Sequence, residues 1–152
     1  MGEGATVGSS AAVFGSARVF GAAEVFGTAW VFDSAAVSGT ARVYGTARVF
    51  GSARVFGAGD IAKQSHVAWV DRVGSGSSIT LHRVRLDGGF GWRINAGCKH
   101  WEAATVEGVI GLVRDNLDSE PVEWSDRDEG TRVRWTCQVH AALLYLSTMV
   151  ED

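Results

Sequence analysis

Residues 40–57 read TARVYGTARVFGSARVFG, three copies of one six-residue unit. The aliphatic residue of the unit recurs at every sixth position well beyond this stretch, at Val7, Val13, Val19, Val25, Val31, Val37, Val43, Val49, Val55, Ile61, Val67 and Val73. A small residue stands two positions before most of them, and a glycine follows two positions after many. About half of the chain is therefore one repeated unit, and this repeat decides the fold.

An α-helix cannot use this spacing, because six residues of roughly 100° each place successive valines about 240° apart around the helix. A strand can use it, since alternation in Ala-Arg-Val-Phe puts Ala and Val on one face and Arg and Phe on the other. The following Gly-Ser or Gly-Thr supplies a turn. Short strands with the same inner face, separated by turns, predict a chain that winds in coils. Each coil buries its apolar residues only by stacking on the next coil.

These residues resemble the hexapeptide repeat of left-handed parallel β-helix proteins, in which a small residue follows the aliphatic one by four positions. Val13 with Ala17, and Val43 with Ala47, match that spacing. The resemblance implies an all-β solenoid over residues 1–73, with three hexapeptides per triangular coil and nearly four coils. This sequence departs from the enzymes of that family by placing Phe or Tyr directly after the aliphatic residue.

Three hexapeptides per coil bring residues 18 positions apart into register. Phe14, Phe32 and Phe50 should form one ladder, continued by Ala68, and Phe26 should stack on Tyr44. So many outward rings exceed what a monomer normally exposes, which predicts a homo-oligomer. The alternative is that neighbouring rings and arginine stems cover one another. The predicted interface consists of Phe14, Phe20, Phe26, Trp30, Phe32, Tyr44, Phe50 and Phe56.

The repeat ends at Val73, and the Gly/Ser run at residues 74–78 predicts a linker. Residues 79–152 predict a small α+β cap. Its expected parts are strands 79–86 and 90–96 around the turn Asp87-Gly88-Gly89, a helix after Thr105, an acidic loop over 115–129 and a helix over 133–149.

The cap resembles the C-terminal domain of uncharacterised phage and prophage proteins, through Gly97-Cys98, Trp101 and the apolar helix after Thr105.

Composition excludes several classes of protein. The net charge of -3 and the isoelectric point near 5.8 make a nucleic-acid binder unlikely. No apolar run approaches the roughly 20 residues of a membrane span, and the first residues lack the features of a signal peptide. Two cysteines are too few for a disulfide scaffold. A cytoplasmic protein is expected, in the host cell if a phage encodes it.

Catalysis finds little support in the sequence. Hexapeptide acyltransferases use a histidine base and a loop inserted between coils, whereas this repeat runs without insertion to about Gly59. His66 is the only histidine in the phase of the repeat, and an outward surface residue is the simpler interpretation. No cofactor motif is present, because Gly74-x-Gly76 does not open a helix. Acyl transfer is kept as the alternative to a non-enzymatic function.

A metal site is a weaker possibility. Cys98 with His100, and Cys137 with His140, supply the ligand types of a tetrahedral zinc site, but their spacing is loose and two separate elements would have to meet. We therefore expect no metal here. The favoured interpretation is two small buried thiols and two surface histidines.

The arginines of the cap are the best candidates for binding. Arg83, Arg85 and Arg93 on the hairpin, with Arg132 and Arg134, can form a cluster for a small anionic ligand such as a nucleotide-derived signal. Alternatively, they are exposed and pair with the acidic loop. The sequence thus predicts a non-enzymatic binding protein that oligomerises through its solenoid and binds a host protein or a small anionic ligand.

Overall fold

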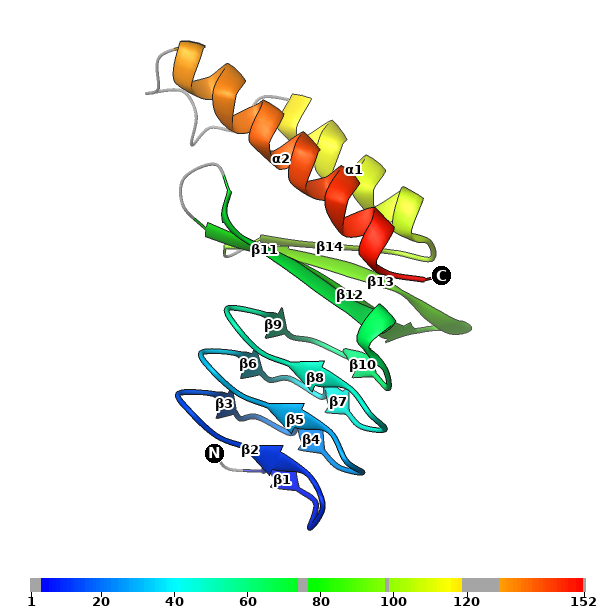
Figure 1. The fold of residues 1–152 in the computed structure, drawn as a ribbon. Coiled ribbons are helices and arrows are strands. Elements are labelled where there is room, and N and C mark those ends of the chain that lie inside the picture. Colours follow the sequence, from blue (N-terminus) through cyan, green and yellow to red (C-terminus); the bar gives the residue numbers. More distant parts are fainter. Residues whose placement is uncertain (1–3, 74–76, 98, 119–128, 152) are drawn as a thin grey trace.

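The computed structural model describes residues 4–73, 77–97, 99–118 and 129–151. The first part is a parallel β-solenoid of about three turns, built from ten two-residue strands (Figure 1). They are β1 (Thr6–Val7), β2 (Ala12–Val13), β3 (Arg18–Val19), β4 (Glu24–Val25), β5 (Trp30–Val31), β6 (Ala36–Val37), β7 (Arg42–Val43), β8 (Arg48–Val49), β9 (Arg54–Val55) and β10 (Asp60–Ile61).

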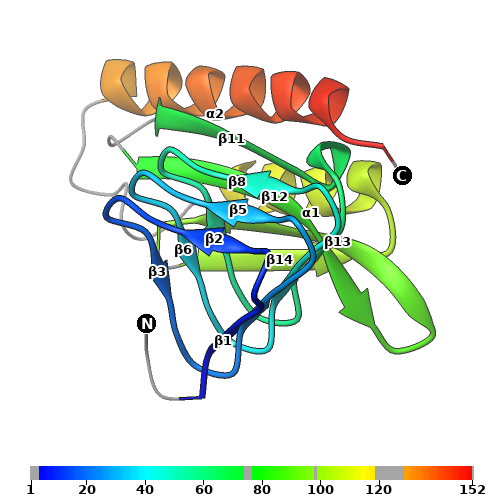
Figure 2. The same ribbon diagram turned by 60° about the horizontal axis from the view of Figure 1, so that its bottom comes forward.

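The strands form three parallel sheets, in the orders β1-β4-β7-β10, β2-β5-β8 and β3-β6-β9. Figure 2 views the solenoid toward its N-terminal end, where the strands lie along the sides of a triangle. Thr6 pairs with Glu24, and Glu24 pairs with Arg42. Each partner lies 18 residues further on, so the structure confirms the predicted register of 18 residues per turn.

The interior of the solenoid is a column of valine and alanine. From Ala23 to Val55, every inward Val and Ala has at most 1% of its surface exposed. The turns must be equally close to one another. Gly39 adopts a φ of +71°, and a Cβ added to it would lie 2.7 Å from the carbonyl oxygen of Gly57 in the next turn. Glycine is needed there, because any side chain would be strained and would collide with the neighbouring backbone.

The solenoid ends earlier than the spacing of the valines predicts. Val67 and Val73 do not lie in a fourth coil, but in β11 (Val67–Val73), which pairs antiparallel with β12 (Ser77–Leu86). The turn glycine of the preceding repeats is replaced by Lys63, and the chain then forms the 3-10 turn η1 (Gln64–His66). From residue 15 to residue 57 this turn position has a positive φ, also where Asp33 replaces glycine, whereas Lys63 is extended (φ −152°) and the chain leaves the solenoid there.

The second part is a four-stranded antiparallel sheet in the order β11-β12-β13-β14, with β13 at Gly89–Ala96 and β14 at Lys99–Ala103. Two helices, α1 (Val106–Asp118) and α2 (Glu129–Met149), cover one face of it (Figure 1). The buried residues between sheet and helices, Leu81, Ile94, Val109, Leu143 and Leu146 among them, form a core separate from that of the solenoid.

The α+β composition of the cap matches the sequence prediction, with some differences in its parts. The hairpin and both helices are present, but α2 begins at Glu129 rather than at residue 133. Strand β14 was not predicted. Of the expected linker, residues 77 and 78 belong to β12, and residues 74–76 lie outside the described part. Within the acidic stretch, residues 115–118 end α1 and residues 119–128 are not described.

The opposite face of the sheet lies on the end of the solenoid, so the molecule has three layers: coils, sheet and helices (Figure 1). Strand β12 contacts both β9 and β10 of the last turns. Neither α1 nor α2 combines the length and the apolar character that a helix needs to span a bilayer.

Candidate functional site

The polar face of the cap sheet completes the hydrogen bonds of the last coil. The N–H of Arg54 donates to Oγ1 of Thr80 (3.0 Å), and its carbonyl oxygen accepts from Nδ2 of Asn95 (3.0 Å). The N–H of Phe56 donates to Nε2 of His82 (3.4 Å). In earlier turns the backbone of the following coil makes these bonds. Here the side chains of β12 and β13 replace it.

His82 must be neutral to serve in this way. Its Nδ1 lies 3.0 Å from the carbonyl oxygen of Arg83, which assigns the proton to Nδ1 and leaves Nε2 as the acceptor. Burial lowers the pKa of His82 to about 4. The imidazole is therefore neutral at pH 7, and its fully buried ring can accept the hydrogen bond from the last coil.

Asp60 is the charged centre of the same junction. Its carboxylate is only 4% exposed, and it accepts from Tyr44 Oη (2.8 Å), Arg83 Nη2 (2.6 Å) and Arg85 Nη1 (3.1 Å). Burial alone would raise the pKa of Asp60, but the hydrogen bonds from Tyr44, Arg83 and Arg85 outweigh it and keep that pKa below its ordinary value. Two arginines of the cap are thereby bound to the last strand of the solenoid.

The predicted arginine cluster is thus assembled only in part. Arg83 and Arg85 converge on Asp60, whereas Arg93 pairs with Glu102 (2.9 Å) and with Oδ1 of Asn95 (2.7 Å). The side chains of Arg132 and Arg134 lie outside the described part of the chain. The carboxylate that binds Arg83 and Arg85 is in the solenoid and not in the acidic loop.

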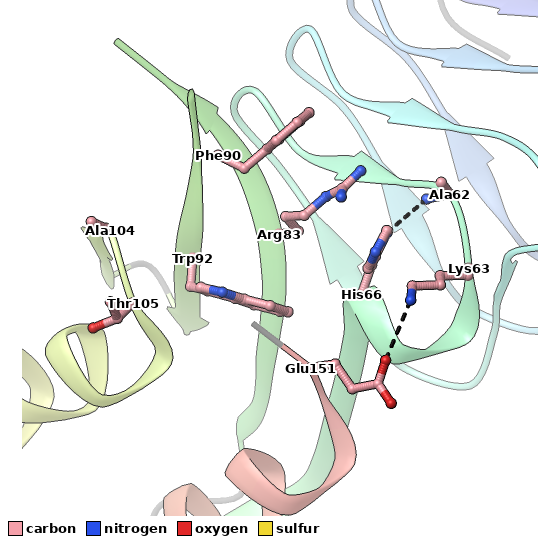
Figure 3. A pocket seen from close by; sticks show the side chains of 9 residues that line it. All are labelled: Ala62, Lys63, His66, Arg83, Phe90, Trp92, Ala104, Thr105 and Glu151. Carbon is pink, nitrogen blue, oxygen red and sulfur yellow. Dashed lines mark hydrogen bonds and ion pairs between the residues drawn. The ribbon is translucent and has the colours of Figure 1, made fainter. Parts of the chain in front are cut away.

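Beside Asp60, a pocket of about 630 Å³ opens where solenoid, sheet and C-terminal segment meet (Figure 3). We call it the junction pocket. The N–H of Glu151 donates to the carbonyl oxygen of Ser65 (3.1 Å) and so holds the C-terminal segment against η1. The pocket is lined by Ala62, Lys63, His66, Arg83, Phe90, Trp92, Ala104, Thr105 and Glu151.

Polar groups line one part of this pocket, as Figure 3 shows. His66 is 5% exposed rather than outward on the surface, and its Nδ1 accepts from the N–H of Ala62 (3.1 Å). Burial, aided by the charges of Arg83 and Lys63, lowers the pKa of His66 to about 4. Lys63 Nζ lies 3.3 Å from Oε2 of Glu151 in an exposed ion pair.

Aromatic groups line another part. The guanidinium carbon of Arg83 lies 4.1 Å from the ring centroid of Phe90, a cation–π contact. Trp92 is the register partner of Arg83 and is 3% exposed. Phe90 is 56% exposed, since it lies near the tip of the hairpin. The pocket thus combines cationic and hydrogen-bond donor groups with two aromatic rings.

A second candidate surface runs along the solenoid. Phe14, Phe32 and Phe50 stack at centroid distances of 5.0 Å with nearly parallel rings. Trp69 continues the ladder edge-on at 4.7 Å from Phe50. Ala68, predicted to continue it, instead lies in the core of the cap, because the chain has left the solenoid by that point. We call Phe14, Trp30, Phe32, Phe50 and Trp69 the aromatic surface.

Trp30 broadens this surface. Its ring lies edge-on to Phe14 (6.1 Å) and Phe32 (6.5 Å), and the guanidinium of Arg48 covers part of it at 4.7 Å. Even so, Phe14 is 48% exposed and Trp30 is 40% exposed. Partial covering by neighbouring rings and by arginine therefore occurs, and it leaves a large part of both rings accessible.

The other aromatic residues of the predicted interface lie on different sides. Phe26 stacks on Tyr44 at 5.0 Å, as predicted, and Tyr44 reaches Asp60 through its hydroxyl. Phe20 is partly buried and lies beneath the guanidinium of Arg18 at 5.3 Å. Phe56 is also partly buried, in the last coil under the cap.

The candidate zinc ligands are not brought together in the described part of the chain. Within it, no group of three or more His, Cys, Asp or Glu side chains is placed to hold a metal ion. His100 is exposed on β14, and Cys137 is exposed on α2 rather than buried. His140 is partly buried on α2, and Cys98 lies outside the described residues.

Sequence reasoning missed Asp60, Lys63, Thr105 and Glu151 as members of these sites. For Asp60 a signal existed, because the outward position before the aliphatic residue is Arg in three successive repeats and then becomes Asp. That reversal of charge coincides with the end of the solenoid.

Comparison with protein-family models, with curated proteins and with solved structures finds no match for this chain.

Proposed function

We propose that this is a non-enzymatic binding protein that self-associates through the aromatic surface of its solenoid and binds a partner through its cap. The observation that carries the proposal is the exposure of Phe14 and Trp30, 48% and 40%, within a ladder of stacked rings. Rings in such contact lose little conformational freedom on binding. They therefore provide apolar area at a low entropic cost, which is why aromatic residues are enriched at interfaces.

The aromatic surface also has the shape that association requires. Its rings follow one side of a rigid coil, and Trp69 extends them into the cap. Trp30 and Arg48 are the residue types that concentrate in interface hot spots. Two copies can place their ladders against each other and so remove from water the ring surface that each copy leaves exposed.

His66 supports binding over acyl transfer. Because its Nδ1 accepts the N–H of Ala62, the proton of the neutral ring is on Nε2. A general base needs a free lone pair directed at the substrate. His66 instead offers the pocket an N–H donor.

The cap supplies the second binding surface, for a host protein or a small anionic ligand. The resemblance to phage and prophage proteins favours an accessory role in the cytoplasm of a bacterial host. In such a role the solenoid joins several copies, and each copy carries one cap.

The test is the mass of the protein in solution, by size exclusion with light scattering. We expect the wild type to have a multiple of the 16.1 kDa chain mass, and Phe14→Ala/Trp30→Ala to shift toward 16.1 kDa. Leu144→Ala is the matched control, since Leu144 is 57% exposed but lies on α2. A wild type that remains at 16.1 kDa at every concentration overturns self-association.

A further inference from the structure

We infer that the junction pocket binds a small organic anion with a flat aromatic body, of the class of an aromatic carboxylate. The inference deepens the proposed function, since it assigns a ligand class to the cap. A volume of about 630 Å³ lies in the usual range of small-molecule sites, and a macromolecule could insert only a side chain or a terminus.

The cationic part of the pocket selects for negative charge. Lys63 and Arg83 carry two positive charges and Glu151 one negative charge, so the lining has a net charge of +1. Arg83 is held in place because its Nε donates to the carbonyl oxygen of Asp60 (3.0 Å) and its Nη2 to the carboxylate (2.6 Å). Nη1 is the nitrogen that this pair does not use. A guanidinium fixed in this way loses little freedom when it binds an anion.

Lys63 and His66 add to this selection. The ion pair of Lys63 with Glu151 is exposed, with 54% and 71% of the two side chains accessible, and exposed pairs of this kind contribute little to stability. A carboxylate can therefore compete for the ammonium group. His66 contributes a neutral donor from Nε2, which fits a carboxylate oxygen.

The aromatic part of the pocket selects for a flat apolar body. Trp92 and Phe90 come from the same strand and lie on the same face of the sheet, with Ala62 and Ala104 completing the wall. Figure 3 shows Trp92 and Phe90 on the same side of the pocket as Arg83. A ligand ring can pack on Phe90, which is 56% exposed, while its acidic group reaches Arg83 and Lys63; Trp92, which is 3% exposed, contributes only a small part of the wall. Phosphate or acetate could contact only the cationic part of the pocket.

The probes are 2-naphthoate, its uncharged analogue 2-naphthamide, and acetate, titrated into the full chain by isothermal calorimetry. We expect saturable binding of one 2-naphthoate per chain. The amide should bind at least about tenfold more weakly, because it lacks the charge-assisted hydrogen bonds. Acetate should show no saturable binding. Equal affinity for the acid and the amide, or non-saturable binding of the acid, overturns the inference.

Two variants locate the site. Lys63→Gln and Phe90→Ala change exposed side chains, so the fold should persist, and each should weaken 2-naphthoate binding by about threefold to tenfold. Arg114→Gln on α1 is the control and should bind as the wild type does. If both pocket variants bind like the wild type, the ligand is elsewhere and the inference fails.

Phe14→Ala/Trp30→Ala separates the two proposals. This variant should lose self-association and keep the affinity for 2-naphthoate. Loss of naphthoate binding in it would place the ligand on the aromatic surface and overturn the assignment to the pocket. A monomeric wild type that still binds 2-naphthoate in the pocket would reject only self-association.

Discussion

Two interfaces inside this molecule satisfy the backbone hydrogen-bonding groups of a coil in different ways. Between coils, backbone pairs with backbone, as where the N–H of Arg18 donates to the carbonyl oxygen of Ala35 (2.9 Å). Between the last coil and the cap, the side chains of Thr80, His82 and Asn95 pair with the backbone. The first interface does not depend on the outward side chains, so the residues on the outer surface of the solenoid can vary. The second depends on particular side chains and on their protonation.

This difference explains where the functional features of the chain lie. The outer side of the solenoid can carry stacked rings, because the fold needs only the inward Val and Ala and the turn glycines. The junction concentrates the buried polar residues, namely Asp60, His66, Thr80, His82 and Asn95. Burying a polar group without a hydrogen-bond partner costs free energy. A substitution at the junction should therefore lower the free energy of unfolding more than one on the outer side of the solenoid.

The largest expected effect comes from Asp60→Asn. This change removes the buried charge that binds Tyr44 and two partly buried arginines, and disruption of a buried ion pair costs about 3–5 kcal/mol. We expect the free energy of unfolding, measured by urea denaturation, to fall by about that amount. Glu102→Gln is the control. Its carboxylate, which pairs with Arg93, is 36% exposed against 5% for Asp60, so its loss should lower the free energy of unfolding by less. Equal losses in the two variants would contradict a special role for the junction.

The next effect is the dependence of stability on pH. The pKa of His82 falls from its ordinary 6.5 to about 4 in the folded protein, so the unfolded chain binds more protons between these values. The free energy of unfolding should therefore be fully present above pH 6.5 and fall as the pH drops toward 4. The slope is up to roughly 1.4 kcal/mol per pH unit for this histidine. His66 should act in the same direction, because its pKa is also lowered.

Urea denaturation at several pH values measures this slope, with His82→Gln as the comparison. The variant keeps a side-chain oxygen that can accept the N–H of Phe56 but cannot titrate, so it should be less sensitive to acid than the wild type. A wild-type stability that is flat between pH 6.5 and pH 4 would show that neither histidine is neutral for structural reasons.

The solenoid could be predicted in detail, whereas the cap could be predicted only in outline. Val43, Val49 and Val55 occupy equivalent places in one unit, so local sequence decides each turn. In the cap, residues 99–103 (KHWEA) show no clean alternation, and β14 becomes a strand only through its pairing with β13. Likewise, Val67 and Val73 keep the six-residue spacing, but the chain is extended at Lys63, forms the 3-10 turn η1 and enters β11.

The candidate sites followed the same division. The stacking of Phe14, Phe32 and Phe50 depends only on the 18-residue register and was predicted correctly. The partner of Arg83 and Arg85 is 23 and 25 residues earlier in the chain and belongs to another structural unit. Only the docking of the sheet on the solenoid brings them together, and no local pattern encodes that contact.

The polar face of the cap takes the place of a next coil. Amide hydrogen exchange followed by NMR tests it most directly. The amides of Arg54 and Phe56 should exchange slowly, with protection similar to that of Ala36 and Ser38, whose N–H groups donate to the next coil (3.0 Å each). Thr80→Val should speed the exchange of the Arg54 amide and leave Ala36 unchanged. If the amides of Arg54 and Phe56 exchange at the rate of an unstructured peptide in the wild type, the cap does not complete the solenoid, and the account is contradicted.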